Sequence, residues 1–270
     1  KSQDNKDNNF FWLSKETSIL INNWFMMYFL SVVLIGTMYP IFLEVITTEK
    51  ISVGPPFYNK LIIPFLIPFL FAMAIGPKLK WIKSNLQDKM NLIILLIISF
   101  LLSLLIIKNT NLNFLLNTIL VTSGFYLFFI TLRDFFIKGF NKLSQNLAHF
   151  GFSLFILSIL LNNIFSSEII TNLKIGEKFQ KDNIEINFEG VKKKSINNYD
   201  TIIGKFKIID FNGGEEVLEP ELRIYNQPNI VTSEADIKTN IFTDKFMTMN
   251  YVQNQDYFNI RYQVKPFMIW

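Results

Sequence analysis

The chain has 270 residues and a net charge of +4, half of its residues are hydrophobic, and 29 of them are phenylalanine. This apolar content is far above that of an ordinary soluble protein, and no long basic run of the kind that binds nucleic acid is present. The absence of cysteine excludes disulfides and thiolate-bound metals from this chain. A multi-histidine zinc site is excluded as well, because His149 is the single histidine.

Five hydrophobic runs in the first part of the chain approach the ~20 apolar residues that cross a bilayer as a helix. A polar segment, residues 1–16, precedes the runs, which lie at 17–45, 60–77, 90–107, 114–132 and 145–165. The second run contains Pro64 and Pro68, which a membrane helix tolerates where neighbouring groups satisfy the freed carbonyls. The sequence therefore predicts a membrane all-α bundle of about five transmembrane helices over residues 17–165.

Lysine and arginine concentrate in alternate loops between these runs. The loops 78–89 and 133–144 are basic, whereas the loop 46–59 and the connection after the third run carry few positive charges. Short basic loops of membrane proteins stay on the cytoplasmic or matrix side. Everything after about residue 166 is then expected on the opposite side of the membrane.

The last hundred residues have a β-like pattern of short, partly alternating apolar runs. Strands are predicted at 183–188, 205–210, 217–225, 229–233, 246–252 and 257–264. The run Asn212-Gly213-Gly214 indicates a hairpin. We expect a small extracytoplasmic β domain over residues 166–265, a sandwich or a barrel. Residues 266–270 are interpreted as the start of a further transmembrane helix, and the chain as a fragment of a longer protein.

His149 is the sharpest candidate for a functional residue, about one turn inside the fifth run. An ionisable side chain in a membrane span is usually functional, and a neutral imidazole is a standard axial ligand of haem iron. Gly151 would let a flat macrocycle or a neighbouring helix come close. The alternative is a hydrogen-bonded structural histidine. If His149 binds haem, the second axial ligand must come from outside this chain.

The loop 51–59 is the second candidate. Glycine and proline fix its backbone and two aromatic residues follow, in the order Gly54, Pro55, Pro56, Phe57 and Tyr58. Such a loop either handles a ligand or partner, or is a stiff connector that caps two spans. No phosphate loop, nucleophile motif or metal-ligand spacing is present, so catalytic residues are not identified.

Taken together, the motifs resemble the C-terminal part of the CcmF family of membrane haem lyases, which belong to the system I pathway of cytochrome c maturation. The resemblance covers essentially the whole chain and rests on stretches that occur in the family's order: Ser14-Lys15-Glu16 with Asn22-Asn23, Gly36 to Pro40, Ile51 to Asn59, Gly76-Pro77 with Trp81, Ala148 to Gly151, Arg223 to Asn226 with Thr232 to Ala235, and Lys265 to Phe267 with Trp270. A closely related family for nitrite reductase haem attachment would share most of them.

The resemblance implies a haem lyase that receives haem from the chaperone CcmE and attaches it to apocytochrome c on the outer face, together with a CcmH-type thiol subunit. It also implies a membrane haem b between two histidines, with quinol as a candidate electron donor, and His149 matches the second of these ligands. The implied location is the bacterial inner membrane with the β domain in the periplasm, or alternatively the mitochondrial inner membrane.

This chain lacks several haem-binding features of the family. The tryptophan-rich haem-binding segment, the two outer histidines and the first haem b histidine all lie upstream in the family. We therefore expect this part alone to be incompetent as a lyase and to need the upstream half as a partner.

Two alternatives remain open from the sequence, a permease or transporter subunit with an extracytoplasmic β domain, and a non-catalytic scaffold of the maturation complex. An ion-coupled transporter needs acidic residues deep within its spans. Asp134, which follows the fourth run, is instead expected to mark a helix end at the membrane interface.

Overall fold

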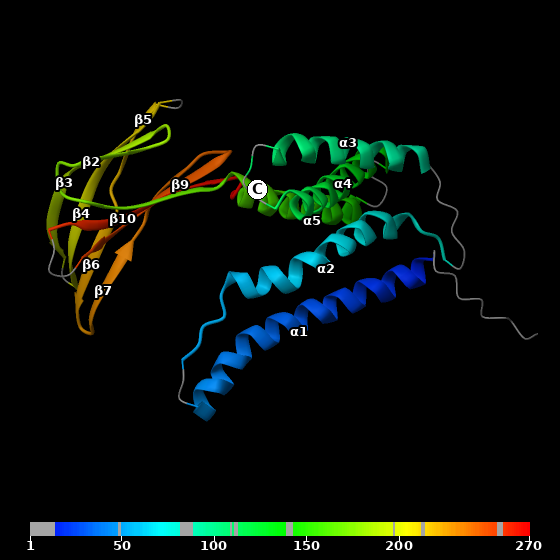
Figure 1. Cartoon of the computed structure of the whole chain (residues 1–270), viewed down its shortest axis with the longest axis horizontal. Coiled ribbons are helices and arrows are strands. Elements are labelled where there is room, and N and C mark those ends of the chain that lie inside the picture. The colour runs from blue at the N-terminus through cyan, green and yellow to red at the C-terminus, as the bar shows by residue number, and fades with distance from the viewer. Residues whose placement is uncertain are drawn as a thin grey trace, which may run out of the picture. The chain divides into compact units, whose positions relative to one another are not determined.

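The computed structural model describes residues 14–47, 50–81, 89–108, 110, 113–138, 143–196, 198–211, 214–252 and 256–270. The chain divides into two compact units, Lys1–Leu157 and Ser158–Trp270. The first unit is helical, and the second is built mainly from β strands (Figure 1). The predicted fold class, about five long apolar helices followed by a β domain, is confirmed.

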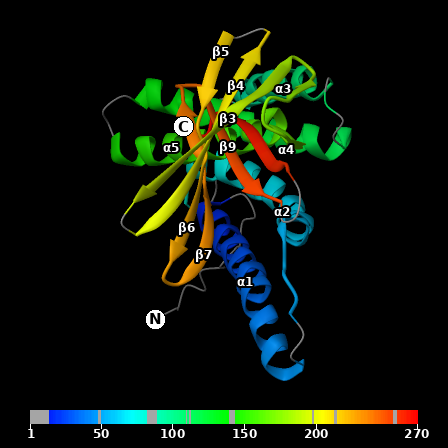
Figure 2. The ribbon, with the colours of Figure 1, turned by 90° about the vertical axis from the view of Figure 1, so that its left-hand side faces the viewer.

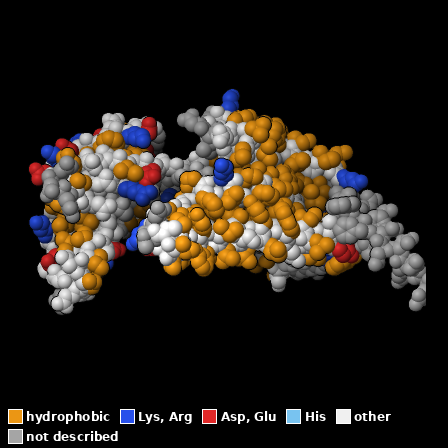
Figure 3. Space-filling view, turned by 60° about the horizontal axis from the view of Figure 1, so that its bottom comes forward, with side chains coloured by type: hydrophobic (Ala, Val, Ile, Leu, Met, Phe, Trp, Pro, Cys, Tyr) orange, Lys and Arg blue, Asp and Glu red, His pale blue; other side chains and the backbone are white. Residues whose placement is uncertain are grey.

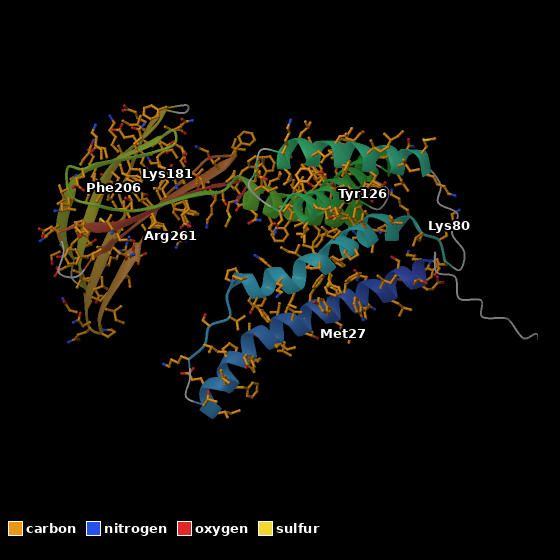
Figure 4. The ribbon with its side chains drawn as sticks, in the orientation of Figure 1. Met27, Lys80, Tyr126, Lys181, Phe206 and Arg261 are labelled. Carbon is orange, nitrogen blue, oxygen red and sulfur yellow. The ribbon has the colours of Figure 1, made fainter. Side chains whose placement is uncertain are left out.

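Five helices in the described residues are long and apolar enough to cross a membrane, by length and composition. They are α1 (Lys15–Thr47), α2 (Pro55–Ile75), α3 (Lys89–Ile107), α4 (Phe114–Lys138) and α5 (Leu143–Phe165), and a 3-10 turn, η1 (Gly76–Lys78), follows α2. Hydrophobic side chains cover the helical unit in Figure 3, whereas charged ones gather on the β unit. Met27 on α1 is 68% exposed, as expected for a side chain that faces lipid (Figure 4).

The second helix corrects the prediction of a loop over residues 51–59. α2 begins at Pro55, with Gly54 in an extended conformation before it. Proline is favoured in the first turn of a helix because its missing N–H has no partner there in any case. Pro55 and Pro56 therefore start the helix, and Phe57 and Tyr58 lie in its first turn.

Helix α4 is the most buried of the five spans and packs against both α2 and α3. Hydroxyl pairs join it to its neighbours, with 2.6 Å between Ser103 Oγ and Thr122 Oγ1 and 2.7 Å between Thr131 Oγ1 and Ser153 Oγ. Such pairs are typical of helix contacts in membranes, where small polar residues let backbones come close. Tyr126 lies among these helices (Figure 4).

Two glycines set the contact between α1 and α2. A Cβ atom at Gly36 would lie 2.7 Å from Tyr58 Oη, and one at Gly76 would lie 2.4 Å from Ser18 Oγ. Between these points aromatic rings fill the interface, for example Phe25 and Phe69 with centroids 5.6 Å apart. The two helices are therefore antiparallel and closest where one of them has no side chain.

The β unit contains two antiparallel sheets. The four-stranded sheet has the order β1-β10-β9-β8, and the six-stranded sheet has the order β2-β3-β4-β6-β7, with β5 paired to β4. Long hairpins β3–β4 and β6–β7 are visible in Figures 1 and 2. The strands are β1 (Ser167–Leu173), β2 (Lys178–Lys181), β3 (Ile184–Ile196), β4 (Tyr199–Asp210), β5 (Gly214–Leu218), β6 (Glu221–Asn226), β7 (Asn229–Glu234), β8 (Asp236–Thr239), β9 (Thr243–Tyr251) and β10 (Phe258–Pro266).

The inner faces of the two sheets form one apolar core. Phe188 and Phe206 are fully buried and stacked with centroids 4.3 Å apart, and Met249 and Ile260 come from the other sheet. Figure 4 places Phe206 within this layer. The period-two alternation of these strands thus produces a sandwich. Of the predicted hairpin, Asn212 and Gly213 lie outside the described residues, but Gly214 pairs with Asp210 as a β4–β5 turn requires.

Candidate functional site

His149 lies in the second turn of α5, with its side chain half-buried. Two neighbouring contacts fix the rotation of this helix. One turn after His149, the Ser153 hydroxyl is hydrogen-bonded to the Thr131 hydroxyl of α4. Directly after His149, the Phe150 ring packs against two rings of α4, with centroids 5.7 Å from Phe128 and 5.8 Å from Phe135. His149 and Ser153 are four residues apart and so share a face of the helix. The imidazole is therefore held close to α4 rather than turned away from it.

His149 lines two adjoining cavities in the helical unit, of about 420 Å³ and 250 Å³. The residues common to both are Lys15, Met73, Pro77, Gln145 and His149. Helices α1, α2 and α5 contribute to both walls, and α4 closes the larger cavity. Polar and apolar residues share the walls of both cavities, and six of the eleven residues around the larger one are polar or charged. A cavity in which polar groups converge beside apolar surface is a candidate small-molecule or cofactor site.

The larger cavity also has an acidic group, but that group is paired. Asp134 Oδ1 lies 2.7 Å from Lys78 Nζ, and the two side chains are only 16% and 14% exposed. The pair is nearly neutral as a unit, because each charge offsets the other at short range. Asp134 was expected at a helix end, but α4 continues to Lys138 and Asp134 lies within its last turns.

Lys15 is the other charged residue on the cavity walls. Its backbone N–H donates to Lys80 O at 3.0 Å, and its Nζ lies 5.1 Å from the centre of the Trp81 ring. Ser14 caps α1 just before it by accepting a hydrogen bond from the Thr17 N–H at 3.2 Å. The start of α1 is thus anchored beside the end of α2. A ligand with an apolar body and a negatively charged edge would suit these walls.

The remaining candidate residues lie away from these cavities. Gly151 is exposed, and a Cβ atom built there would meet nothing within 4 Å. It is two residues from His149 and so projects from a different face of the helix. Tyr58 packs against Gly36, and Phe57 contacts the Tyr58 ring at 5.3 Å. Close approach to a macrocycle by Gly151 and ligand handling by Gly54–Tyr58 stay predictions.

Sequence reasoning identified His149 and singled out Lys15, Asn22, Gly76 and Pro77 as motif residues, but it did not place them around one site. Lys15, Asp134 and His149 come from three helices, and no spacing in the sequence links them. The described residues contain no group of three His, Cys, Asp or Glu side chains that could hold a metal ion directly.

Comparison with known proteins gives a consistent result in sequence and fold. Residues 164–266 match the family described as the CcmF C-terminal beta-sandwich. The chain is 27% identical to the cytochrome c-type biogenesis protein CcmF of Pseudomonas fluorescens over 95% of its length, and this covers 41% of that relative. It is 25% identical to CcmF of Escherichia coli, covering 97% of this chain and 42% of the relative. With NrfE of Haemophilus influenzae the identity is 24%, over 97% and 42% of the two chains.

A solved structure has the same fold. The protein titled "Cytochrome c Heme Lyase CcmF" aligns with a TM-score of 0.72 at 20% identity, covering 96% of this chain and 44% of that one. The chain thus spans about two fifths of the length of the relatives that it matches. It is similar over nearly its whole length to the C-terminal part of the CcmF, CycK and NrfE cytochrome c biogenesis proteins.

Proposed function

We propose that this chain forms part of a membrane haem lyase for cytochrome c maturation and contributes His149 as one axial ligand of a haem b. The observation that carries the proposal is the position of the single histidine. It lines two adjoining cavities between helices of a chain related to CcmF.

The walls fit a haem in three respects. His149 offers an imidazole from a helix, a standard mode of haem ligation. Met73, Ala74 and Ile130 supply apolar surface for the macrocycle, and Lys15 supplies a positive charge that suits a propionate carboxylate. The haem would provide one-electron chemistry, and the protein would hold it, exclude water and set its potential. Its second axial ligand would come from outside this chain.

The β unit is proposed to lie on the outer face of the membrane, where haem is joined to apocytochrome c. The charge bias of the loops supports this side, because 78–89 and 133–144 are the basic loops. Proposed partners are the upstream part of the lyase, the haem chaperone CcmE, a CcmH-type thiol subunit and apocytochrome c. Quinol is the proposed electron source for the haem. Lyase activity is assigned to that assembly and not to this chain alone.

A visible spectrum tests the haem ligand directly. The complex that contains this chain is purified from its membrane, and reduced-minus-oxidised spectra are compared for the wild type, His149→Ala and Leu147→Ala. Leu147 is the matched control, because it lies two residues away on α5 and is 54% exposed. We expect a low-spin b-type signal in the wild type and in Leu147→Ala, and loss of that signal or conversion to high spin in His149→Ala.

Added imidazole separates ligation from misfolding. Because His149→Gly leaves space beside the cavity, free imidazole should restore the low-spin spectrum in that variant but change nothing in the wild type. An unchanged b-type signal in His149→Ala would make this histidine structural and would leave only the family relationship standing.

A further inference from the structure

An exposed apolar turn links β8 and β9 in the second unit. Ile241 is 70% exposed and Phe242 is 59% exposed. Turns of soluble domains are normally built from polar residues, glycine and proline. Two large apolar side chains at such a turn indicate a surface that is covered by something other than water.

The turn does not stand alone, because the residues after β10 pack against it. The Phe267 N–H donates to Phe242 O at 2.7 Å, and Trp270 Nε1 donates to Ile241 O at 2.9 Å. The Trp270 ring lies 5.8 Å from Phe242 and 5.1 Å from Phe267. Met268, between them, is 58% exposed. These five residues, Ile241, Phe242, Phe267, Met268 and Trp270, are called the apolar patch below.

The apolar patch is continuous with the end of α5. Phe165, the last residue of that helix, lies 6.5 Å from Phe267 between ring centres. One turn earlier, Asn162 Nδ2 donates to Pro266 O at 2.7 Å. α5 is long and apolar enough to cross a membrane. The patch therefore lies at the end of a helix that can cross a membrane.

Two backbone carbonyls at this turn do not depend on water for a hydrogen bond. The carbonyls of Ile241 and Phe242 both accept hydrogen bonds from within the protein. Groups that enter the lipid region must be satisfied internally, since no water is available there. The segments 240–243 and 266–270 also contain no charged residue. Tryptophan and other aromatic residues are enriched at the boundary between lipid and water.

We infer that the apolar patch inserts into the lipid headgroup region and that the β8–β9 turn anchors the β domain on the bilayer surface. The occupant of this surface is inferred to be lipid, because the patch adjoins the end of a helix that is long and apolar enough to cross a membrane. The inference does not rest on the role of His149. It also predicts that other exposed apolar residues of the domain stay in water, such as Val231 of β7, which is 61% exposed.

Spin labelling tests the inference, because this chain has no cysteine of its own. Phe242→Cys and Val231→Cys are labelled with a nitroxide in the complete complex, reconstituted in phosphatidylcholine and phosphatidylglycerol vesicles. The unsubstituted complex gives the background from other subunits. Collisions with oxygen report lipid, and collisions with a water-soluble nickel chelate report water. We expect a severalfold higher oxygen-to-nickel ratio at position 242 than at position 231.

Each other outcome overturns the inference. Equal ratios at the two positions would place the turn in water. Protection of position 242 from both reagents would place a protein there instead of lipid. Because Phe242 contacts Trp270, Ile241→Cys serves as a second labelled variant at the side chain that is most exposed. It keeps the test decisive if the first variant does not fold.

Discussion

The contact between Gly36 and Tyr58 allows a quantitative test of how the helical unit is packed. A Cβ atom at position 36 would lie 2.7 Å from Tyr58 Oη and 2.9 Å from two ring carbons. The ring is rigid and is already in contact with Phe57. Relief of this overlap requires the helices to separate slightly, and overpacking of this kind costs about 1–3 kcal/mol.

Helix propensity opposes this cost. Alanine is more favourable than glycine inside a helix by up to ~1 kcal/mol. We therefore expect Gly36→Ala to destabilise the protein by about 0–3 kcal/mol. In a Tyr58→Ala background the overlap is gone, so the same substitution becomes neutral or stabilising by up to ~1 kcal/mol. The coupling energy of the double-mutant cycle equals the overpacking cost, about 1–3 kcal/mol.

The four variants are compared by sodium dodecyl sulfate titration of the purified complex in mixed micelles, followed by circular dichroism. Gly76→Ala is the matched control. Its Cβ atom would lie 2.4 Å from Ser18 Oγ and 3.6 Å from Ser18 Cβ. The hydroxyl can turn away about χ1 and the second distance is an ordinary contact, so a smaller loss of stability is expected. A coupling energy near zero, or a greater loss for Gly76→Ala than for Gly36→Ala, would refute the packing argument.

Two further predictions concern charge. Lys15→Gln should lower the midpoint potential of the proposed haem, because removal of a positive charge favours the oxidised iron. At an effective dielectric of about 20, a unit charge placed about 10 Å from the iron would contribute ~1.7 kcal/mol, or ~70 mV. Lys15→Arg should leave the potential nearly unchanged, and equal potentials in all three proteins would remove Lys15 from the site. In the β unit, burial raises the pKa of Tyr262 above its usual value, reinforced by Glu216 and Asp210. The folded protein keeps this proton while the unfolded chain loses it, so stability should fall above pH ~10 by up to ~1.4 kcal/mol per unit. If the stability of Tyr262→Phe falls as steeply above pH ~10 as that of the wild type, groups other than Tyr262 cause the effect.

The spans could be predicted because the signal for a membrane helix is local. Length and apolar content fix α3 to within one residue, 89–107 against a predicted 90–107. The error at α2 has a physical origin, since Pro55-Pro56 suits both a rigid loop and a first helical turn. The contact of Tyr58 with Gly36, which lies in another helix, is long-range information that the local sequence does not carry.

The sequence was sufficient to predict a β domain, but not the boundaries and the order of its strands. The predicted strand 217–225 is two strands, β5 and β6, separated by Glu219 and Pro220. They pair with different parts of β4, which no local pattern reveals. The short strands β2 and β8 carry too few alternating residues to be recognised by period. Strand order depends on pairing between residues far apart in sequence, such as β1 with β10.

The motifs that suggested the family divide into two physical roles. Gly36 and Tyr58 lie at one end of the α1–α2 contact, and Ser18 and Gly76 lie at the other. Of the motif residues, Lys15, Gly76, Pro77 and Asn22 reach the cavity walls together with His149. Some motif residues therefore set the packing of α1 against α2 and others line the cavities, and His149 is the one that the proposed function assigns as a ligand. On this reasoning, substitutions that separate α1 from α2 should weaken haem binding without touching His149, and the same spectra and titrations measure both effects.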